Sequence, residues 1–181
     1  NYVAMEYVPG RTLRKVLGKD TLTLTELVDV FAKTASALAE AHAADVIHRD
    51  LKFDNVMVAR QADGRLRVTV LDFGVAKPMT DKGRMELTRK GQVPGTPAIV
   101  APELVDEKPP TPRSDLYSLG VLAFTALAGH EPFEADNDLE LMRAHKFDDL
   151  PELRESVPDY VPRSLIELTE QLLAKTPEER P

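Results

Sequence analysis

Hydrophobic side chains recur at helical spacing in the first third of the chain, and this repeat predicts a long helix over residues 25–44. The positions on its apolar face lie three or four residues apart: Val28, Phe31, Ala35, Leu38 and His42. Thr25 precedes the repeat and carries a side-chain oxygen that can cap a helix N-terminus. We therefore expect an amphipathic helix that begins near Thr25 and packs one face against a core.

Two shorter patterns predict β structure. Residues 2–8 form a brief apolar run that stops at Pro9-Gly10, as expected of a buried strand that enters a turn. Residues 56–59 are apolar, Asp63-Gly64 has the composition of a tight turn, and apolar and polar residues alternate over 66–71. These patterns predict one early strand and one β-hairpin.

The second half of the chain has mostly helical patterns. Residues 116–127 are apolar on almost every side, which predicts a helix buried all round. Further helical stretches cover about 139–146 and 163–175. Residues 77–100 are polar and without a steady period, and a compact domain tolerates such a segment mainly when it is functional. The expected fold class is α+β, mainly helical with one small hairpin.

Composition narrows the classes of function. The formal net charge is −7 and the pI is about 5.2, which argues against nonspecific nucleic-acid binding because that needs a basic surface. The chain has no cysteine, so disulfides, thiolate nucleophiles and cysteine–zinc sites are excluded. No apolar run approaches the ~20 residues of a membrane helix, and no signal-peptide pattern is visible. Because the first residue is Asn1, we interpret the chain as a fragment of a longer protein.

The polar segments around the hairpin carry residues suited to phosphoryl transfer. Residues 48–55 read His-Arg-Asp-Leu-Lys-Phe-Asp-Asn, and Asp72-Phe73-Gly74 follows the second strand. A hairpin can hold Asn55 at the head of one strand and Asp72 at the foot of the other, so that their oxygens converge on a hard cation such as Mg²⁺. Asp50 can accept the proton of an attacking hydroxyl, and Lys52 can direct a point charge at the transferred phosphate. The alternative is a solvated charged loop whose side chains cap the ends of the hairpin.

With Gly95-Thr96-Pro97 and Ala101-Pro102-Glu103 further on, these ordered motifs resemble those of the eukaryotic-type protein kinases. The segment MEYVPGRTL and the C-terminal helices are similar to bacterial members, and Lys52 favours serine/threonine specificity. The resemblance implies a protein-kinase-like fold in which residues 1–8 are the last N-lobe strand and the hinge, and the rest of the N-lobe is largely missing. Residues 9–181 are then the C-lobe, truncated at its C-terminal end, with a catalytic loop at 48–55 and an activation segment at 72–103. ATP and Mg²⁺ (or Mn²⁺) are the implied cofactors.

The resemblance also implies a nucleotide site at the start of the chain. Met5 would be the gatekeeper residue, and the backbone of Glu6 and Val8 would hydrogen-bond the adenine. Leu13 and Met57 would line the floor beneath the adenine ring. For Met57 a plain core role is nearly as well supported, because a methionine in a strand usually fills space.

Further residues match structural positions of the family. His48 and Phe73 correspond to packing residues. Asp115 corresponds to a buried aspartate that braces the backbone of the catalytic loop, and the alternative for Asp115 is a plain helix cap. Arg180 corresponds to the arginine that pairs with the Glu103 position.

A regulatory site is implied as well. Arg49 and Lys77 stand where the family forms a basic pocket for a phosphorylated residue of the activation segment. Thr88 is the first candidate for that residue and Thr80 the second, and we expect Thr88 to be autophosphorylated in trans by a second copy. The alternative is that Arg49 and Lys77 merely pair with Asp81 or Glu86.

Several departures and alternatives remain open. The chain has no glycine-rich loop, no strand lysine and no partner glutamate; Phe53 replaces a common proline, Ile99 a usual tyrosine, and the hairpin tip at 60–65 is long. The leading function is an ATP-dependent Ser/Thr protein kinase; the alternatives are a non-catalytic pseudokinase or scaffolding lobe, and a small-molecule kinase. The expected partners are Ser/Thr-bearing protein substrates and the missing N-lobe of the parent chain, without nucleic acid. We expect this chain alone to be inactive, and its location to be cytoplasmic, with a membrane anchor elsewhere in the parent still compatible.

Overall fold

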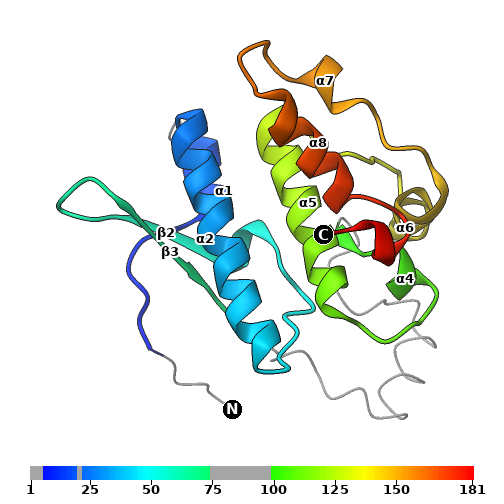
Figure 1. Cartoon of the computed structure of the whole chain (residues 1–181), viewed down its shortest axis with the longest axis horizontal. Helices are drawn as coiled ribbons and strands as arrows, with labels where there is room; N and C mark the ends of the chain where they lie inside the picture. Colours follow the sequence, from blue (N-terminus) through cyan, green and yellow to red (C-terminus); the bar gives the residue numbers. More distant parts are fainter. Residues whose placement is uncertain (1–5, 20–21, 74–98) are drawn as a thin grey trace.

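The computed structural model describes residues 6–19, 22–73 and 99–181 (Figure 1). In Figure 1 the chain forms two neighbouring groups of elements, one built on a β-hairpin with helices α1 and α2, the other built of helices α4 to α8. Helices α2 and α5 contact each other where the two groups meet. The predictions for Met5, Lys77 and Thr88 lie outside the described residues.

Helix α2, Leu24–Ala43, is the long helix expected from the apolar repeat. It is capped by Thr23 and not by Thr25, so the predicted starting residue was wrong. The Thr23 hydroxyl accepts from the backbone N–H of Glu26 at 3.2 Å, and the Glu26 carboxylate accepts from the backbone N–H of Thr23 at 3.0 Å. This reciprocal pair satisfies two N–H groups that the helix itself cannot, which fixes the start of the helix.

The sheet has three antiparallel strands in the order β1-β2-β3: Arg11–Thr12, Val56–Arg60 and Leu66–Val70. Strands β2 and β3 form the predicted hairpin, with Val58 opposite Val68. Strand β1 was not predicted, and residues 6–8 of the expected early strand have no regular structure. Gly10 allows β1 to pair with β2, because it has a φ of +119° and a Cβ there would lie 2.5 Å from the Val58 carbonyl oxygen.

Helix α5, Pro112–Ala128, is the buried helix at the centre of the second group. It begins after the cap Thr111 and ends at Gly129, whose φ of 82° lies in the left-handed region that closes helices. The remaining elements are α1, Leu13–Lys19; α4, Pro102–Val105; α6, Asp138–Phe147; α7, Leu153–Ser156; α8, Arg163–Leu172; and the 3₁₀ turns η1, Phe53–Asn55, and η3, Pro177–Glu179. Helices α5 and α8 pack closely at Gly120, where an added Cβ would lie 2.8 Å from Leu172 Cβ.

The described fold is thus a mixture of helices with one small antiparallel sheet. One hydrophobic core runs through both groups and includes Leu13 and Leu51 near the sheet and Phe124 on α5. In the part of the chain that the structure describes, every helix is too short or too polar to cross a membrane.

Candidate active site

Asp50 and Lys52 lie in the loop between α2 and β2, directly before the 3₁₀ turn η1. Lys52 Nζ donates to Asp50 Oδ2 at 2.6 Å. Both side chains are 31% exposed, so the carboxylate is held in one position while remaining open to a reacting molecule. A positioned and accessible carboxylate is what general-base chemistry requires.

Asn55 connects this loop to the end of the hairpin. Its side-chain Nδ2 donates to the backbone carbonyl of Asp50 at 2.9 Å, and its backbone carbonyl accepts from the backbone N–H of Leu71 at 2.8 Å. Asp72 follows Leu71, is exposed, and has a φ of 60°. The hairpin therefore brings Asn55 and Asp72, the two predicted metal ligands, to the same end of the sheet.

The donor set at this end fits a hard cation. Since the nitrogen of the Asn55 amide is engaged by Asp50, its oxygen is the atom left to face a ligand, beside the carboxylate of Asp72. Mg²⁺ prefers oxygen ligands and is commonly held by one or two carboxylates together with substrate phosphates. Across residues 6–19, 22–73 and 99–181, no three His, Asp or Glu side chains converge on one point as a metal site. A cation held by Asn55 and Asp72 would therefore also need oxygen ligands from the substrate phosphates.

Asp115 on α5 holds the backbone of the loop. Its Oδ1 accepts from the N–H of Arg49 at 2.9 Å, and its Oδ2 accepts from the N–H of His48 at 2.8 Å. Asp115 is 1% exposed and lies four residues inside the helix from the cap Thr111, so the alternative of a plain helix cap does not apply. A buried carboxylate that accepts from several donors keeps those donor groups in a fixed geometry.

His42 is a contributor that the sequence analysis missed. Its Nε2 lies 2.7 Å from Asp115 Oδ2, so the last turn of α2 is tied to the same carboxylate as the loop. The residue was counted as one position of the apolar face of α2. The available signal was a polar ring at that position, six residues before His48.

His48 and Arg49 have different surroundings although they are neighbours. His48 is fully buried, with Nε2 2.8 Å from the carbonyl of Leu71 and its ring centroid 4.9 Å from that of Phe73. Arg49 has a φ of 70° and an exposed side chain, which forms no ion pair with any of the described residues. The other two members of the expected regulatory site, Lys77 and Thr88, lie outside the described ranges.

The predicted adenine-binding residues are spread over several environments. Glu6 is exposed and Val8 is half-buried, both in a segment without regular structure. Leu13 is fully buried in the core, so in this structure it presents no surface to a nucleotide. Met57 is half-buried on β2.

Glu103 and Arg180 form a buried ion pair far from the loop in sequence. Arg180 Nη1 donates to Glu103 Oε1 and Nη2 donates to Oε2, each at 2.9 Å. Burial alone would raise the pKa of Glu103, but hydrogen bonds, above all from Arg180 and also from Ser114, lower it below its usual value. The pair joins α4 to the segment after α8 and so closes the second group of helices.

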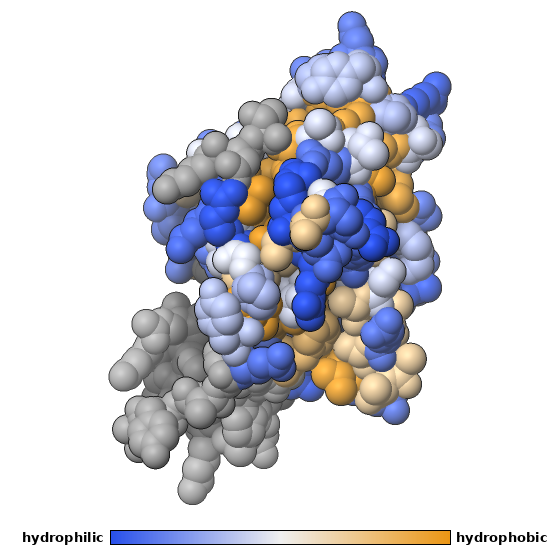
Figure 2. All heavy atoms as spheres, turned by 90° about the vertical axis from the view of Figure 1, so that its left-hand side faces the viewer, coloured by the Kyte–Doolittle hydropathy of each residue, from blue (hydrophilic) through white to orange (hydrophobic). Residues whose placement is uncertain are grey.

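The cavities found among the described residues do not coincide with these side chains. One of about 530 Å³ lies between β1 and the hairpin and is lined by Gly10, Val16 and Val58, among others. Another of about 330 Å³ lies between α2 and the hairpin. Figure 2 views the molecule from the side on which the hairpin projects, where hydrophilic side chains gather at the centre and hydrophobic ones show around them.

Comparison with known proteins identifies the family. The model of the protein kinase domain matches residues 1–181, and the chain belongs to this family. The family uses ATP and divalent metal ions in general.

Individual relatives are bacterial. The chain is 38% identical over 184 residues to the serine/threonine-protein kinase pkn3 of Myxococcus xanthus, covering 99% of this chain and 34% of the relative. It is 37% identical over 177 residues to the serine/threonine-protein kinase PknA of Mycobacterium tuberculosis, covering 97% of this chain and 38% of the relative. It is 34% identical over 180 residues to the serine/threonine-protein kinase PkaA of Streptomyces coelicolor, covering 99% of this chain and 32% of the relative. The chain thus spans about a third of the length of these relatives.

Proposed function

We propose that this chain carries the catalytic loop of an ATP-dependent protein kinase that transfers the γ-phosphoryl group to Ser and Thr hydroxyls of protein substrates. The observation that carries the proposal is the Asp50 carboxylate, held 2.6 Å from Lys52 Nζ in a loop whose backbone is bonded to Asp115. The names of the bacterial relatives support Ser/Thr specificity.

Each residue of the loop has a role in this proposal. Asp50 orients the substrate hydroxyl and accepts its proton, while Lys52 stabilises negative charge on the transferred phosphoryl group. Asn55 and Asp72 would hold Mg²⁺ or Mn²⁺, and the bound cation would neutralise phosphate charge. The backbone of Glu6 and Val8 would hydrogen-bond the adenine, Met5 would be the gatekeeper, and Met57 would line the floor beneath the adenine ring.

The test is phosphate transfer from radiolabelled ATP to a library of Ser- and Thr-containing peptides, measured with the full-length protein. Asp50→Asn should lower the rate about 10²–10⁴-fold while leaving the circular dichroism spectrum unchanged. Asp45→Asn is the matched control, because Asp45 is exposed, lies just before the loop, and has a φ of 58° that Asn tolerates. A rate for Asp50→Asn within tenfold of wild type would rule out this assignment. Nucleotide binding without any transfer by the wild type would favour a non-catalytic scaffold instead.

We also propose that Arg49 and Lys77 receive a phosphate carried by Thr88, added in trans by a second copy. The support is the exposed guanidinium of Arg49, which no described carboxylate neutralises, next to the catalytic Asp50. A phosphate adds about −1.5 to −2 charges and can form new charge-assisted hydrogen bonds with both cations. Mass spectrometry after incubation with ATP should find Thr88 modified, and Thr88→Ala should lower activity more than Thr80→Ala. An unmodified Thr88 together with full activity of the alanine variant would exclude the switch.

A further inference from the structure

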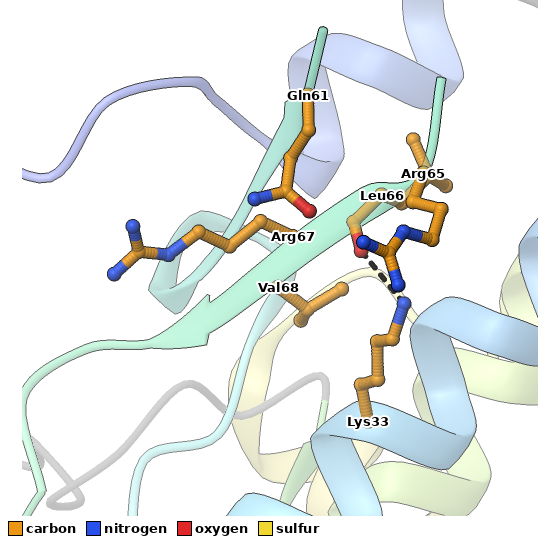
Figure 3. A pocket seen from close by; sticks show the side chains of 6 residues that line it. All are labelled: Lys33, Gln61, Arg65, Leu66, Arg67 and Val68. Carbon is orange, nitrogen blue, oxygen red and sulfur yellow. Dashed lines mark hydrogen bonds between the residues drawn. The ribbon is translucent and has the colours of Figure 1, made fainter. Parts of the chain in front are cut away.

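The cavity between α2 and the hairpin lies apart from the proposed active site and has no role in it. Its volume is about 330 Å³, and its lining comprises Lys33, Gln61, Arg65, Leu66, Arg67 and Val68 (Figure 3). Figure 3 shows Lys33 reaching up from α2 to Leu66, with the guanidinium of Arg65 beside it, whereas the side chain of Arg67 points to the other side of the strand. We propose that this cavity docks an acidic, extended segment of a partner protein.

The rim of the cavity is cationic. Lys33 is paired with Asp29 at 2.7 Å and Arg65 with Asp63 at 2.6 Å. Arg67 is exposed and forms no ion pair with any of the described residues. On a chain with a formal net charge of −7, this unneutralised guanidinium marks a local site where a carboxylate is attracted.

The backbone of β3 supplies the second half of the site. Gln61 N–H donates to Arg65 O at 2.9 Å and Leu71 N–H donates to Asn55 O at 2.8 Å, which sets the alternation of hydrogen-bonded pairs along the hairpin. In that register Leu66 and Val68 direct their N–H and C=O groups away from β2. Lys33 Nζ donates to the outward carbonyl of Leu66 at 2.7 Å, which agrees with this direction.

Strand β3 is an edge of the described sheet, since the order is β1-β2-β3. An edge strand with outward backbone groups binds an extended chain by strand addition, and alternate side chains of that chain then reach the same side. Leu66 and Val68 present apolar side chains on one face of β3 and Arg67 lies on the other face, because successive side chains of a strand alternate. An extended segment with alternating acidic and apolar residues satisfies all three features.

Charge also decides between a protein segment and a nucleic acid. Each phosphate of a nucleic acid needs its own cation for strong binding, and two of the three cations in this lining are already paired with carboxylates. A single unneutralised arginine with a neighbouring backbone edge suits a peptide. The inference does not depend on the proposed kinase activity, because its test measures binding alone.

The probe is a fluorescein-labelled decapeptide of alternating Glu and Val, titrated with the full-length protein in a fluorescence-anisotropy assay. We expect saturable binding that weakens when salt is raised from 0.1 to 0.4 M, and no binding of the matching Lys–Val peptide. Arg67→Glu should raise the Kd about tenfold, as loss of a favourable charge contact at a rim does when repulsion replaces it.

Arg163→Glu is the matched control. Arg163 is an exposed arginine of α8, and its replacement changes the net charge of the chain by the same amount without touching the hairpin. Equal effects of the two variants, or no saturable binding of the acidic peptide, would overturn the proposal. So would a single-stranded oligonucleotide that competes as well as the unlabelled peptide.

Two N-methylated versions of the peptide test the backbone half. One carries the methyl groups on the odd residues and the other on the even residues, so strand addition should abolish the binding of one version and spare the other. Full binding of both versions would show that no strand is added and would overturn this part of the proposal.

Discussion

The backbone N–H of Leu71 donates to the carbonyl of Asn55 at 2.8 Å, and this bond closes the hairpin at the end that faces the catalytic loop. Asn55, which precedes β2, and Asp72, which follows β3, are therefore held at one end of the same sheet. The strand register brings the two residues to this end, and the bond from Asn55 Nδ2 to the Asp50 carbonyl fixes the asparagine side chain.

Removing the Asp72 carboxylate should raise the Mg²⁺ concentration needed for nucleotide binding, because it removes an anionic oxygen ligand. Asn55→Ala should do the same more mildly, since a neutral amide oxygen is a weaker ligand for a hard cation. Nucleotide affinity is measured at a series of Mg²⁺ concentrations in the full-length protein. An unchanged metal dependence of Asp72→Ala would mean that the cation binds elsewhere.

Asp115→Asn should destabilise the fold by about 1–3 kcal/mol. The side-chain NH₂ would replace a carboxylate oxygen that accepts from a backbone N–H, so two donors would face each other without an acceptor. The carboxylate now accepts from two backbone N–H groups and contacts His42 Nε2. Asp159→Asn is the control, since its side chain is fully exposed and its replacement should stay within about 0.5 kcal/mol. Urea unfolding gives both values.

Asp115→Asn also tests whether Asp115 orients the catalytic loop or only stabilises the fold. If Asp115 orients the loop, Asp115→Asn should lower kcat with little change in the KM for ATP, measured where the protein remains folded. A loss of stability with full kcat would show that the loop keeps its geometry without the carboxylate.

Breaking the Glu103–Arg180 pair from one side should cost about 3–5 kcal/mol, because the remaining group stays buried without its partner. Arg180 is 2% exposed and also donates to the carbonyls of Arg113, Ala174 and Lys175. We expect Arg180→Met and Glu103→Gln each to destabilise strongly, and the double variant to lose less than the two single variants together. Additive losses in thermal and urea unfolding would contradict a coupled pair.

Gly120→Ala should destabilise the protein by about 1–3 kcal/mol, as overpacking of a tight helix contact does. The added Cβ would lie 2.8 Å from Leu172 Cβ and 3.1 Å from Leu173 Cγ. Gly18→Ala is the matched control on α1, where no atom lies within 4 Å of an added Cβ. That control should stabilise by about 0.5–1 kcal/mol through helix propensity. A Gly120→Ala variant as stable as wild type, or more stable, would mean that α5 and α8 adjust without cost.

Lys175 predicts a pH dependence of stability. Burial lowers its pKa from 10.5 to about 8, against the attraction of Asp148 and Asp149. The folded state therefore releases this proton at a lower pH than the unfolded chain, so the unfolded chain binds more protons between pH 8 and 10.5 and stability rises with pH there. The free energy of unfolding of wild type should rise relative to that of Lys175→Met between pH 7.5 and 9.5. Parallel pH profiles of the two proteins would exclude this contribution.

Most of the regular structure could be predicted from local pattern. The alternation over β3, the apolar repeat of α2 and the all-apolar face of α5 each report burial directly, and each element lies within a few residues of its predicted range. The cap of α2 could also have been found, because Thr23 and Glu26 have the spacing of a capping box. Thr25 was favoured only because it stands nearest to the repeat.

Features that depend on distant contacts could not be predicted in this way. Strand β1 has two residues, and its pairing with β2 depends on the close approach at Gly10 rather than on any strand pattern. The contact of His42 joins residues 73 positions apart, so the polar ring within the apolar repeat is a local signal but does not indicate the partner. Leu13 was expected beneath a nucleotide, whereas its burial is decided by the packing of α1 on the sheet and core.

The pairing of Glu103 with Arg180 has a consequence for biosynthesis. The two residues are 77 positions apart, so Glu103 leaves the ribosome well before its guanidinium partner exists. At about 5–20 residues per second, that interval is roughly 4–15 s. Burying the Glu103 carboxylate without its partner is energetically costly, so α4 must stay hydrated during this time. The second group of helices therefore completes its folding only after Arg180 has emerged.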